Sequence, residues 1–293
     1  MDFLCEKLNE EYGCEITNRI IEGYSNKRFT TFRVNNLKVD RNIVKEKLES
    51  LGFILKEVSF YKEAFILVNG SEKDLERLDI YEKGFIYLQS LSSMLPVLYL
   101  DPKSRENILD MASAPGGKTT QIASVSNGEA FITACEKNKI RSERLKYNIL
   151  KQSAPRVSVL VTDARKLDPY FTFDKILLDA PCSGSGTIYQ DSSVVTKELV
   201  DRCVNVQREL LRKAISLLKK EQEMIYSTCS ILKEENEKQL EYFIKNGVIE
   251  IIPLDTSMLE DVFLLPSNIE GTVLVGPNQF YEGFFIAKIK KKK

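Results

Sequence analysis

Two cysteines of this 293-residue chain lie where a nucleophile could act. Cys182 comes shortly after the apolar run 175–178, and Cys229 comes shortly after the strand-like run 223–226. Both are surrounded by small residues, which leave room for a ligand. Cysteine is the side chain best suited to covalent attack on carbon. We therefore predict that these two thiols take part in covalent catalysis.

The other cysteines have no comparable setting, and we interpret them as small buried residues. They are Cys5, Cys14, Cys135 and Cys203, and the chain has no C-x-x-C pair and no histidine. A zinc site, a histidine-dependent triad and a histidine general base are therefore not expected. We predict that no metal is bound.

The run 107–120 is a second candidate site. An apolar stretch ends at Asp110, small residues follow, and the chain turns at residues 115–117 before an amphipathic run begins. This order predicts a strand, a tight turn and a helix, with glycines that let the backbone approach a ligand. Residues 117–119 read GKT, as in a P-loop, but the P-loop motif needs a glycine at position 112, where this chain has Ala112. The G-x-G-x-x-G pattern of a dinucleotide site is also missing, so we favour a nucleoside cofactor.

Strand-like runs alternate with charged helical runs from residue 84 onward. Expected strands cover residues 107–110, 131–135, 157–161, 175–178 and 223–226, and expected helices cover residues 119–125, 139–150 and 199–218. This repeated unit is typical of a parallel sheet with helices on both faces, in which ligands bind beyond the carboxyl ends of the strands. The residues at or just after those ends are Asp110, Glu136, Asp163, Asp179 and Cys229. We expect them to face one site.

Two of these acids suit the polar groups of a nucleoside. Glu136, after the second strand, fits an acceptor for ribose hydroxyls. Asp163, after the third, fits an acceptor for an adenine amino group. A single acid at a strand end is often only a helix cap, but acids after successive strands favour a binding site.

Residues 1–85 mix charged helical segments with short strand-like runs. They are expected to form a small α/β domain, separate from residues 86–293. The best strand candidates are 30–35 and 63–68. Basic residues gather within residues 27–45, with Phe29 and Phe32 interleaved: Lys27, Arg28, Arg33, Lys38, Arg41 and Lys45. This mixture suits a nucleic-acid backbone and an unstacked base. It equally suits a solvated face over a small core.

Composition is ordinary for a globular protein, with 43% hydrophobic and 29% charged residues. The formal net charge is zero, so overall charge does not predict a polyanionic partner. No uncharged apolar run is long enough to span a membrane, and the first residues do not resemble a signal peptide. We expect a cytoplasmic monomer. The closing run of four lysines is interpreted as a frayed tail.

The motifs together resemble one family. Residues 110–119, 179–184 and 227–230 look like the Sun/nucleolar-protein family of RNA cytosine-C5 methyltransferases, and residues 32–35, 88–94 and 283–287 look similar too. The resemblance implies S-adenosylmethionine as cofactor and a class I methyltransferase (Rossmann-like) sheet. It also implies a small N-terminal α/β domain that helps to hold RNA, through residues such as Arg28, Arg33 and Arg41. Ribosomal RNA is slightly preferred over transfer RNA as substrate.

The family's site residues carry over to matching positions. The cofactor loop would consist of Ala112, Ser113, Ala114, Pro115, Gly116, Gly117 and Lys118. Glu136 would hold the ribose, Asp163 the adenine, and Asp179 would contact both cofactor and base. Cys229 matches the nucleophile and Cys182 the cysteine associated with product release. The chain departs from the family after Thr187, where arginines are frequent in other members, so the RNA contacts of that loop are in doubt.

The implied chemistry assigns each group a task. Thiolate addition at C6 of cytosine makes C5 nucleophilic enough to accept a methyl group, and the thiolate needs a polar or cationic neighbour. Asp179 is the candidate to protonate N3, if burial beside the base raises its pKa. The base that removes the C5 proton is not identified. Two alternatives stay open: a DNA cytosine-C5 methyltransferase, in which Cys182 would attack, and a non-catalytic RNA-assembly factor.

Overall fold

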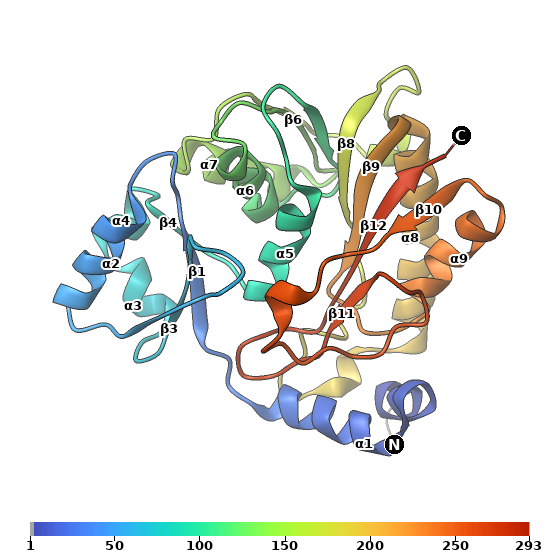
Figure 1. Ribbon diagram of the computed structural model, residues 1–293, viewed down its shortest axis with the longest axis horizontal. Coiled ribbons are helices and arrows are strands. Elements are labelled where there is room, and N and C mark those ends of the chain that lie inside the picture. The colour runs from blue at the N-terminus through green and yellow to red at the C-terminus, as the bar shows by residue number, and fades with distance from the viewer. Residues whose placement is uncertain (1–2, 293) are drawn as a thin grey trace.

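The computed structural model describes residues 3–292 and contains two sheets (Figure 1). A large sheet with helices on both faces occupies most of the molecule. A small sheet with its own short helices lies beside it, on the left of the view. The predicted α/β architecture is confirmed.

The large sheet has eight strands in the order β10-β12-β9-β8-β5-β6-β7, with β11 paired to β12. Their bounds are β5 Asn107–Asp110, β6 Phe131–Cys135, β7 Val157–Leu160, β8 Phe173–Asp179, β9 Leu218–Thr228, β10 Ile249–Ile252, β11 Val273–Val275 and β12 Phe284–Lys291. Strands β5 to β9 run parallel, and β12 is antiparallel to β9, β10 and β11. Lys290 and Lys291 therefore belong to a paired strand, and the interpretation of this end as a frayed tail is wrong for them.

Alternate side chains of the central strands enter two different cores. In β8, Ile176 and Leu178 face one core, and Leu177 faces the other. The first core includes α8 Lys197–Leu217 and α9 Glu237–Lys245, and the second includes α5 Leu91–Leu100, α6 Gly117–Val125 and α7 Lys139–Lys151. This alternation has the two-residue period of a strand that is buried on both faces.

The first helical segment packs on the large sheet. It is labelled α1, spans Phe3–Ser25 and is kinked at Gly13, and its apolar residues Leu4, Leu8 and Ile20 join the core that contains α8. Tyr12 Oη donates a hydrogen bond to the Ile231 carbonyl at 2.5 Å. Residues 3–25 thus contribute to the large part of the molecule, although they lie within the expected N-terminal domain of residues 1–85.

The small sheet has the order β2-β3-β1-β4 and is antiparallel. Its strands are β1 Thr30–Val34, β2 Leu55–Glu57, β3 Ala64–Leu67 and β4 Ile86–Leu88, and its helices are α2 Arg41–Ser50, α3 Glu72–Glu76 and α4 Asp79–Glu82. Phe32, Val44, Leu48 and Phe65 are central to its separate core. Because β4 ends at Leu88, the small sheet extends past residue 85, and the domain division there stays a prediction.

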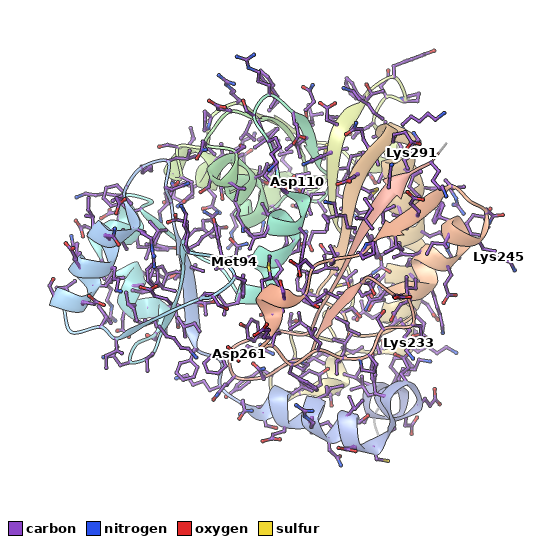
Figure 2. The ribbon with its side chains drawn as sticks, viewed as in Figure 1. Met94, Asp110, Lys233, Lys245, Asp261 and Lys291 are labelled. Atoms are coloured by element: carbon purple, nitrogen blue, oxygen red, sulfur yellow. The ribbon has the colours of Figure 1, made fainter. Side chains whose placement is uncertain are left out.

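The two sheets are joined by buried contacts. Met94 of α5 packs with residues of the small sheet, and Figure 2 shows it between the two parts. Arg33 of β1 is fully buried. Its guanidinium donates to Gln89 Oε1 at 2.9 Å, to the Gly117 carbonyl at 3.0 Å and to Thr120 Oγ1 at 2.8 Å. The guanidinium of Arg33 thus binds groups inside the protein. A contact between Arg33 and RNA would need this side chain to be exposed, and it stays a prediction.

No helix within residues 3–292 is long and apolar enough to cross a membrane. Over the same residues, His, Cys, Asp and Glu side chains form no group of three or more that is placed to hold a metal ion.

Candidate active site

The candidate residues from different strands meet at one edge of the large sheet. Strands β5, β6, β8 and β9 are parallel, so their carboxyl ends lie together. A cleft of about 300 Å³, here called the catalytic cleft, is lined by Asp110, Lys118, Asp179 and Cys229; Asp110 is labelled in Figure 2. A smaller cleft of about 60 Å³ is lined by Glu136 and Asp163. Ala112 lines both clefts, so the cofactor loop separates them.

The two predicted catalytic thiols are in direct contact. Cys182 Sγ lies 3.1 Å from Cys229 Sγ. The hydrogen bond to Cys229 and burial raise the pKa of Cys182 well above its usual value, and the charge of Glu235 adds to this effect. Cys182 is therefore a protonated thiol at neutral pH, able to donate its proton to the sulfur of Cys229.

Lys118 brings a positive charge to the same cleft. Its Nζ lies 2.8 Å from Asp179 Oδ2 and donates to Ser93 Oγ at 2.6 Å. Burial lowers the pKa of Lys118, but Asp179 and Cys229 outweigh burial, and the net pKa is raised. Lys118 thus stays charged beside Cys229, which is the setting that favours a thiolate. The sequence pattern assigned Lys118 only to the cofactor loop.

Asp179 is held by two neighbours at the edge of the catalytic cleft. Its side chain is 27% exposed, and its two oxygens are engaged by Lys118 Nζ and by Ser227 Oγ, which donates to Oδ1 at 2.8 Å. The expected burial is that beside a bound base, so the role of Asp179 in protonating N3 stays a prediction.

Glu235 holds the backbone beside Cys182 through hydrogen bonds. It is fully buried, and its Oε1 accepts from the Ser183 backbone N–H at 2.8 Å and from Gln207 Nε2 at 3.0 Å. Gln207 Nε2 also donates to the Pro181 carbonyl at 3.0 Å. These bonds hold the residues on either side of Cys182. Glu235 follows Cys229 by six positions in an acidic helical run, and no spacing signal distinguished it in the sequence.

Two side chains of α7 hold the cofactor loop. The carbonyl of Ala114 accepts from Arg141 Nη2 at 2.7 Å, and the carbonyl of Pro115 accepts from Asn148 Nδ2 at 2.8 Å. Gly116 has φ +108°, and a Cβ there would lie 3.0 Å from a methyl group of Leu145. Ser113 lines the catalytic cleft together with Ala112, Ala114, Pro115 and Gly117. Arg141 and Asn148 thus hold the loop, and its other side lines the catalytic cleft.

Asp110, the last residue of β5, holds the other end of the same loop. It is buried, and its Oδ2 accepts a hydrogen bond from Thr119 Oγ1 at 2.7 Å. Burial is the main reason that the pKa of Asp110 is raised to about 6. This acid links the end of β5 to the start of α6.

Glu136 and Asp163 face the smaller cleft with different partners. Glu136 is buried, and its Oε1 accepts from the Asn138 backbone N–H at 2.7 Å. Asp163 forms an ion pair with Arg165, and these hydrogen bonds lower the pKa of Asp163 to about 2. The lowered pKa keeps Asp163 ionised at neutral pH. Both carboxyl groups line the smaller cleft, on the side of the loop away from the thiols. As hydrogen-bond acceptors they fit the hydroxyl and amino donors of a nucleoside cofactor.

The other two arginines expected to bind RNA lie outside both clefts. Arg28 donates to the carbonyls of Thr187 and Ile188 at 3.2 and 2.9 Å. Arg41 lies over the ring of Phe65, 4.9 Å from its centroid, and 3.4 Å from Glu57. RNA contacts by Arg28 and Arg41 stay predictions.

Comparison with known proteins agrees with this arrangement. Residues 97–290 match the family described as 16S rRNA methyltransferase RsmB/F, and residues 2–72 match the RsmF/B-like ferredoxin-like domain. A 25S rRNA (cytosine-C(5))-methyltransferase nop2 of Schizosaccharomyces pombe is 32% identical, over 99% of this chain and 50% of its own length. Ribosomal RNA small subunit methyltransferase F of Psychromonas ingrahamii is 34% identical, over 89% of this chain and 56% of its own length.

Solved structures are similar over nearly the whole chain. A methyltransferase homologue from Pyrococcus horikoshii has a TM-score of 0.84 and 31% identity, with 98% of both chains covered. NSun6 from the same organism, solved with SFG, has a TM-score of 0.87 and 24% identity, over 99% of this chain and 98% of its own, and shows the same fold. The chain spans about half the length of the curated relatives it matches. It belongs to the RsmB/F family of rRNA methyltransferases, as its motifs led us to expect.

Proposed function

We propose that this protein transfers a methyl group from S-adenosylmethionine to C5 of a cytosine in structured RNA, with ribosomal RNA preferred over transfer RNA. The observation that carries the proposal is the pair of thiols 3.1 Å apart beside the Lys118–Asp179 ion pair. The names of the relatives, rRNA (cytosine-C(5))-methyltransferases, support the same reaction.

The cofactor would lie across the loop of residues 112–118. Glu136 and Asp163 would accept hydrogen bonds from its nucleoside, and the loop would direct its remaining part into the catalytic cleft. When bound, S-adenosylmethionine supplies an electrophilic methyl group. The other steps depend on side chains of the protein.

Cys229 is the proposed nucleophile. Its thiolate forms a bond to C6, the C5=C6 electron pair becomes available at C5, and N3 takes up a proton or a strong hydrogen bond. Lys118 stabilises the thiolate before attack, and the Lys118–Asp179 pair faces the space that the base would occupy. After methyl transfer C5 loses its proton to a base, the Cys229–C6 bond breaks, and Cys229 leaves as a thiolate. The Cys182 thiol is placed to donate a hydrogen bond to this departing sulfur.

The charges around the two sulfurs support this assignment over the reverse one. Glu235 places a negative charge near Cys182, which opposes a thiolate there, and Lys118 places a positive charge near Cys229. A DNA-type mechanism would need the thiolate on Cys182. No observation favours a non-catalytic assembly factor.

The function is tested by incubating the protein with labelled S-adenosylmethionine and either ribosomal RNA, transfer RNA or duplex DNA. We expect label in RNA only, and bisulfite mapping of total RNA from a deletion strain should identify the cytosine. Label in duplex DNA alone would contradict the proposal.

Removal of either acid in the smaller cleft should weaken cofactor binding. Glu136→Ala and Asp163→Ala each remove a hydrogen-bond acceptor, at a cost of roughly 1–3 kcal/mol in binding free energy. Titration calorimetry measures this cost. Glu209→Ala is the matched control, because Glu209 also pairs with Arg165 but does not line the cleft. Unchanged affinity in both test variants would rule out this cofactor position.

Removal of the Lys118 charge should slow adduct formation. We expect Lys118→Met to reduce methyl transfer roughly 10²-fold, because a cationic group that stabilises developing charge is lost. It should also slow alkylation of Cys229 by iodoacetamide, as followed by mass spectrometry of the Cys229 peptide. Lys118→Arg should restore the alkylation rate in part. An unchanged rate in Lys118→Met would show that Lys118 does not stabilise the thiolate.

A further inference from the structure

Two further clefts open from the sides of the catalytic cleft. The first, of about 570 Å³, is called the Phe29 cleft and shares Leu88, Gln89, Ser90 and Glu282 with the catalytic cleft. The second, of about 420 Å³, is called the Tyr147 cleft and shares Tyr87, Leu88 and Pro115 with it. Leu88, the last residue of β4, lines all three clefts. Each cleft is lined by residues of both the small and the large part of the molecule, and the three are here together called the trough.

The Phe29 cleft combines a flat aromatic surface with positive charge. The rings of Phe29 and Phe280 are stacked, with centroids 5.3 Å apart and planes 11° apart. Lys27 and Lys73 line the cleft and are exposed. Lys56 Nζ lies 5.1 Å from the centroid of Phe280. The acids of this cleft are Glu72, which is exposed, and Glu282, which accepts a hydrogen bond from Ser90 Oγ.

The Tyr147 cleft has the same combination. Tyr147 is 61% exposed, and Lys151 Nζ lies 5.9 Å from the centroid of its ring. Lys151 Nζ lies 3.5 Å from the centroid of Tyr81, and the exposed Arg144 lines the same wall. Glu76 is the acid of this cleft.

The reaction explains why binding is needed on both sides. A base in a helical stack is inaccessible to a thiol beside it, so an enzyme that attacks C6 must hold the base outside the stack. The catalytic cleft would take that one base. The nucleotides before and after it must then leave the cleft through its two open sides, where phosphates need cations and unstacked bases need flat surfaces.

Resting on the proposed function, we infer that the trough binds a single-stranded RNA segment, with the target cytosine in the catalytic cleft and its flanking nucleotides in the Phe29 and Tyr147 clefts. Lys27, Lys73 and Arg144 contact phosphates. Tyr147 and the Phe29–Phe280 pair stack on flanking bases. The sequence-specific part of recognition is not assigned to these residues, because stacking and phosphate contacts accept any base.

The test measures binding of a short fluorescent single-stranded RNA with one central cytosine. Lys27→Glu combined with Lys73→Glu should bind roughly tenfold more weakly, and the slope of log affinity against log salt should fall by about 0.7 for each lost phosphate contact. The matched control combines Arg212→Glu with Lys220→Glu. These exposed residues carry the same charge change, and Lys220 lies near the start of β9, far from its carboxyl end. Equal slopes for the two double variants would overturn the assignment of the Phe29 cleft.

Stacking in the Tyr147 cleft is tested separately. With 2-aminopurine placed on either side of the cytosine, the fluorescence at one of the two positions should be quenched on binding, and Tyr147→Leu should remove that quenching. Because Tyr147 is exposed, this change should leave the fold intact. Quenching that persists in Tyr147→Leu would overturn the assignment of this cleft.

The outcomes also separate this inference from the proposed function. Wild-type protein that binds the RNA in the trough but methylates no RNA would contradict the function and leave the trough standing. If the wild-type protein methylates RNA but the variants of the trough residues bind RNA like the control, the assignment of the trough would be contradicted and the proposed function would not.

Discussion

Cys182→Ala is expected to accumulate a covalent protein–RNA complex, and Cys229→Ala is expected to form none. If Cys229 attacks C6, its loss should reduce methyl transfer by at least about 10³-fold, because the reaction has no other route through an adduct. If the Cys182 thiol stabilises the departing sulfur by a hydrogen bond, its loss should leave attack and methyl transfer intact but slow the release of RNA. Denaturing gels of both variants with RNA and cofactor measure the trapped complex directly.

Cys203→Ala is the control for this pair. Cys203 is a half-buried thiol on α8, and its substitution should neither trap RNA nor reduce methyl transfer. Both catalytic-site variants should remain folded, because the loss of one sulfur leaves only a small cavity. The reverse pattern, with a complex from Cys229→Ala and none from Cys182→Ala, would assign the attack to Cys182 and support the DNA-type mechanism.

The position of the site could be predicted because strands and their ends have local signals. Strand β6 was predicted with its observed bounds, and Glu136 and Asp179 lie at the strand ends where the pattern placed them. In a parallel sheet the carboxyl ends of the strands lie at one edge, so residues that follow successive strands lie close together. The 3.1 Å contact between Cys182 and Cys229 joins two such loops.

The parts that could not be predicted depend on long-range partners. Leu4, Leu8 and Ile20 indicate a helix with an apolar face, but nothing local says that this face packs on the large sheet. Strands β10 and β12 add antiparallel pairing to a sheet that was predicted to be parallel. Glu235 is one of several acids in its segment, and only the fold shows that it is the one beneath Cys182.

Arg33 has a structural role that its charge alone did not indicate. In the sequence it belongs to a basic interval and could not be distinguished from Arg28 or Arg41. In the structure it is the largest fully buried side chain among the described residues, and it connects β1 to the loop that would hold the cofactor. Burial lowers the pKa of Arg33, and three hydrogen bonds offset the cost of placing its charge inside.

Arg33→Met should therefore reduce the free energy of unfolding by roughly 3–5 kcal/mol, because it removes three hydrogen bonds of a buried side chain and leaves Gln89 Oε1 without its donor. Urea denaturation followed by circular dichroism measures this loss. Arg41→Met is the matched control and should change stability little, since the Glu57 carboxylate that it leaves is accessible to water. If Arg33→Met proves as stable as Arg41→Met and yet binds RNA more weakly, Arg33 would contact RNA after all. If stability falls as expected, RNA binding must rely on other cations, of which Lys27, Lys73 and Arg144 line the trough.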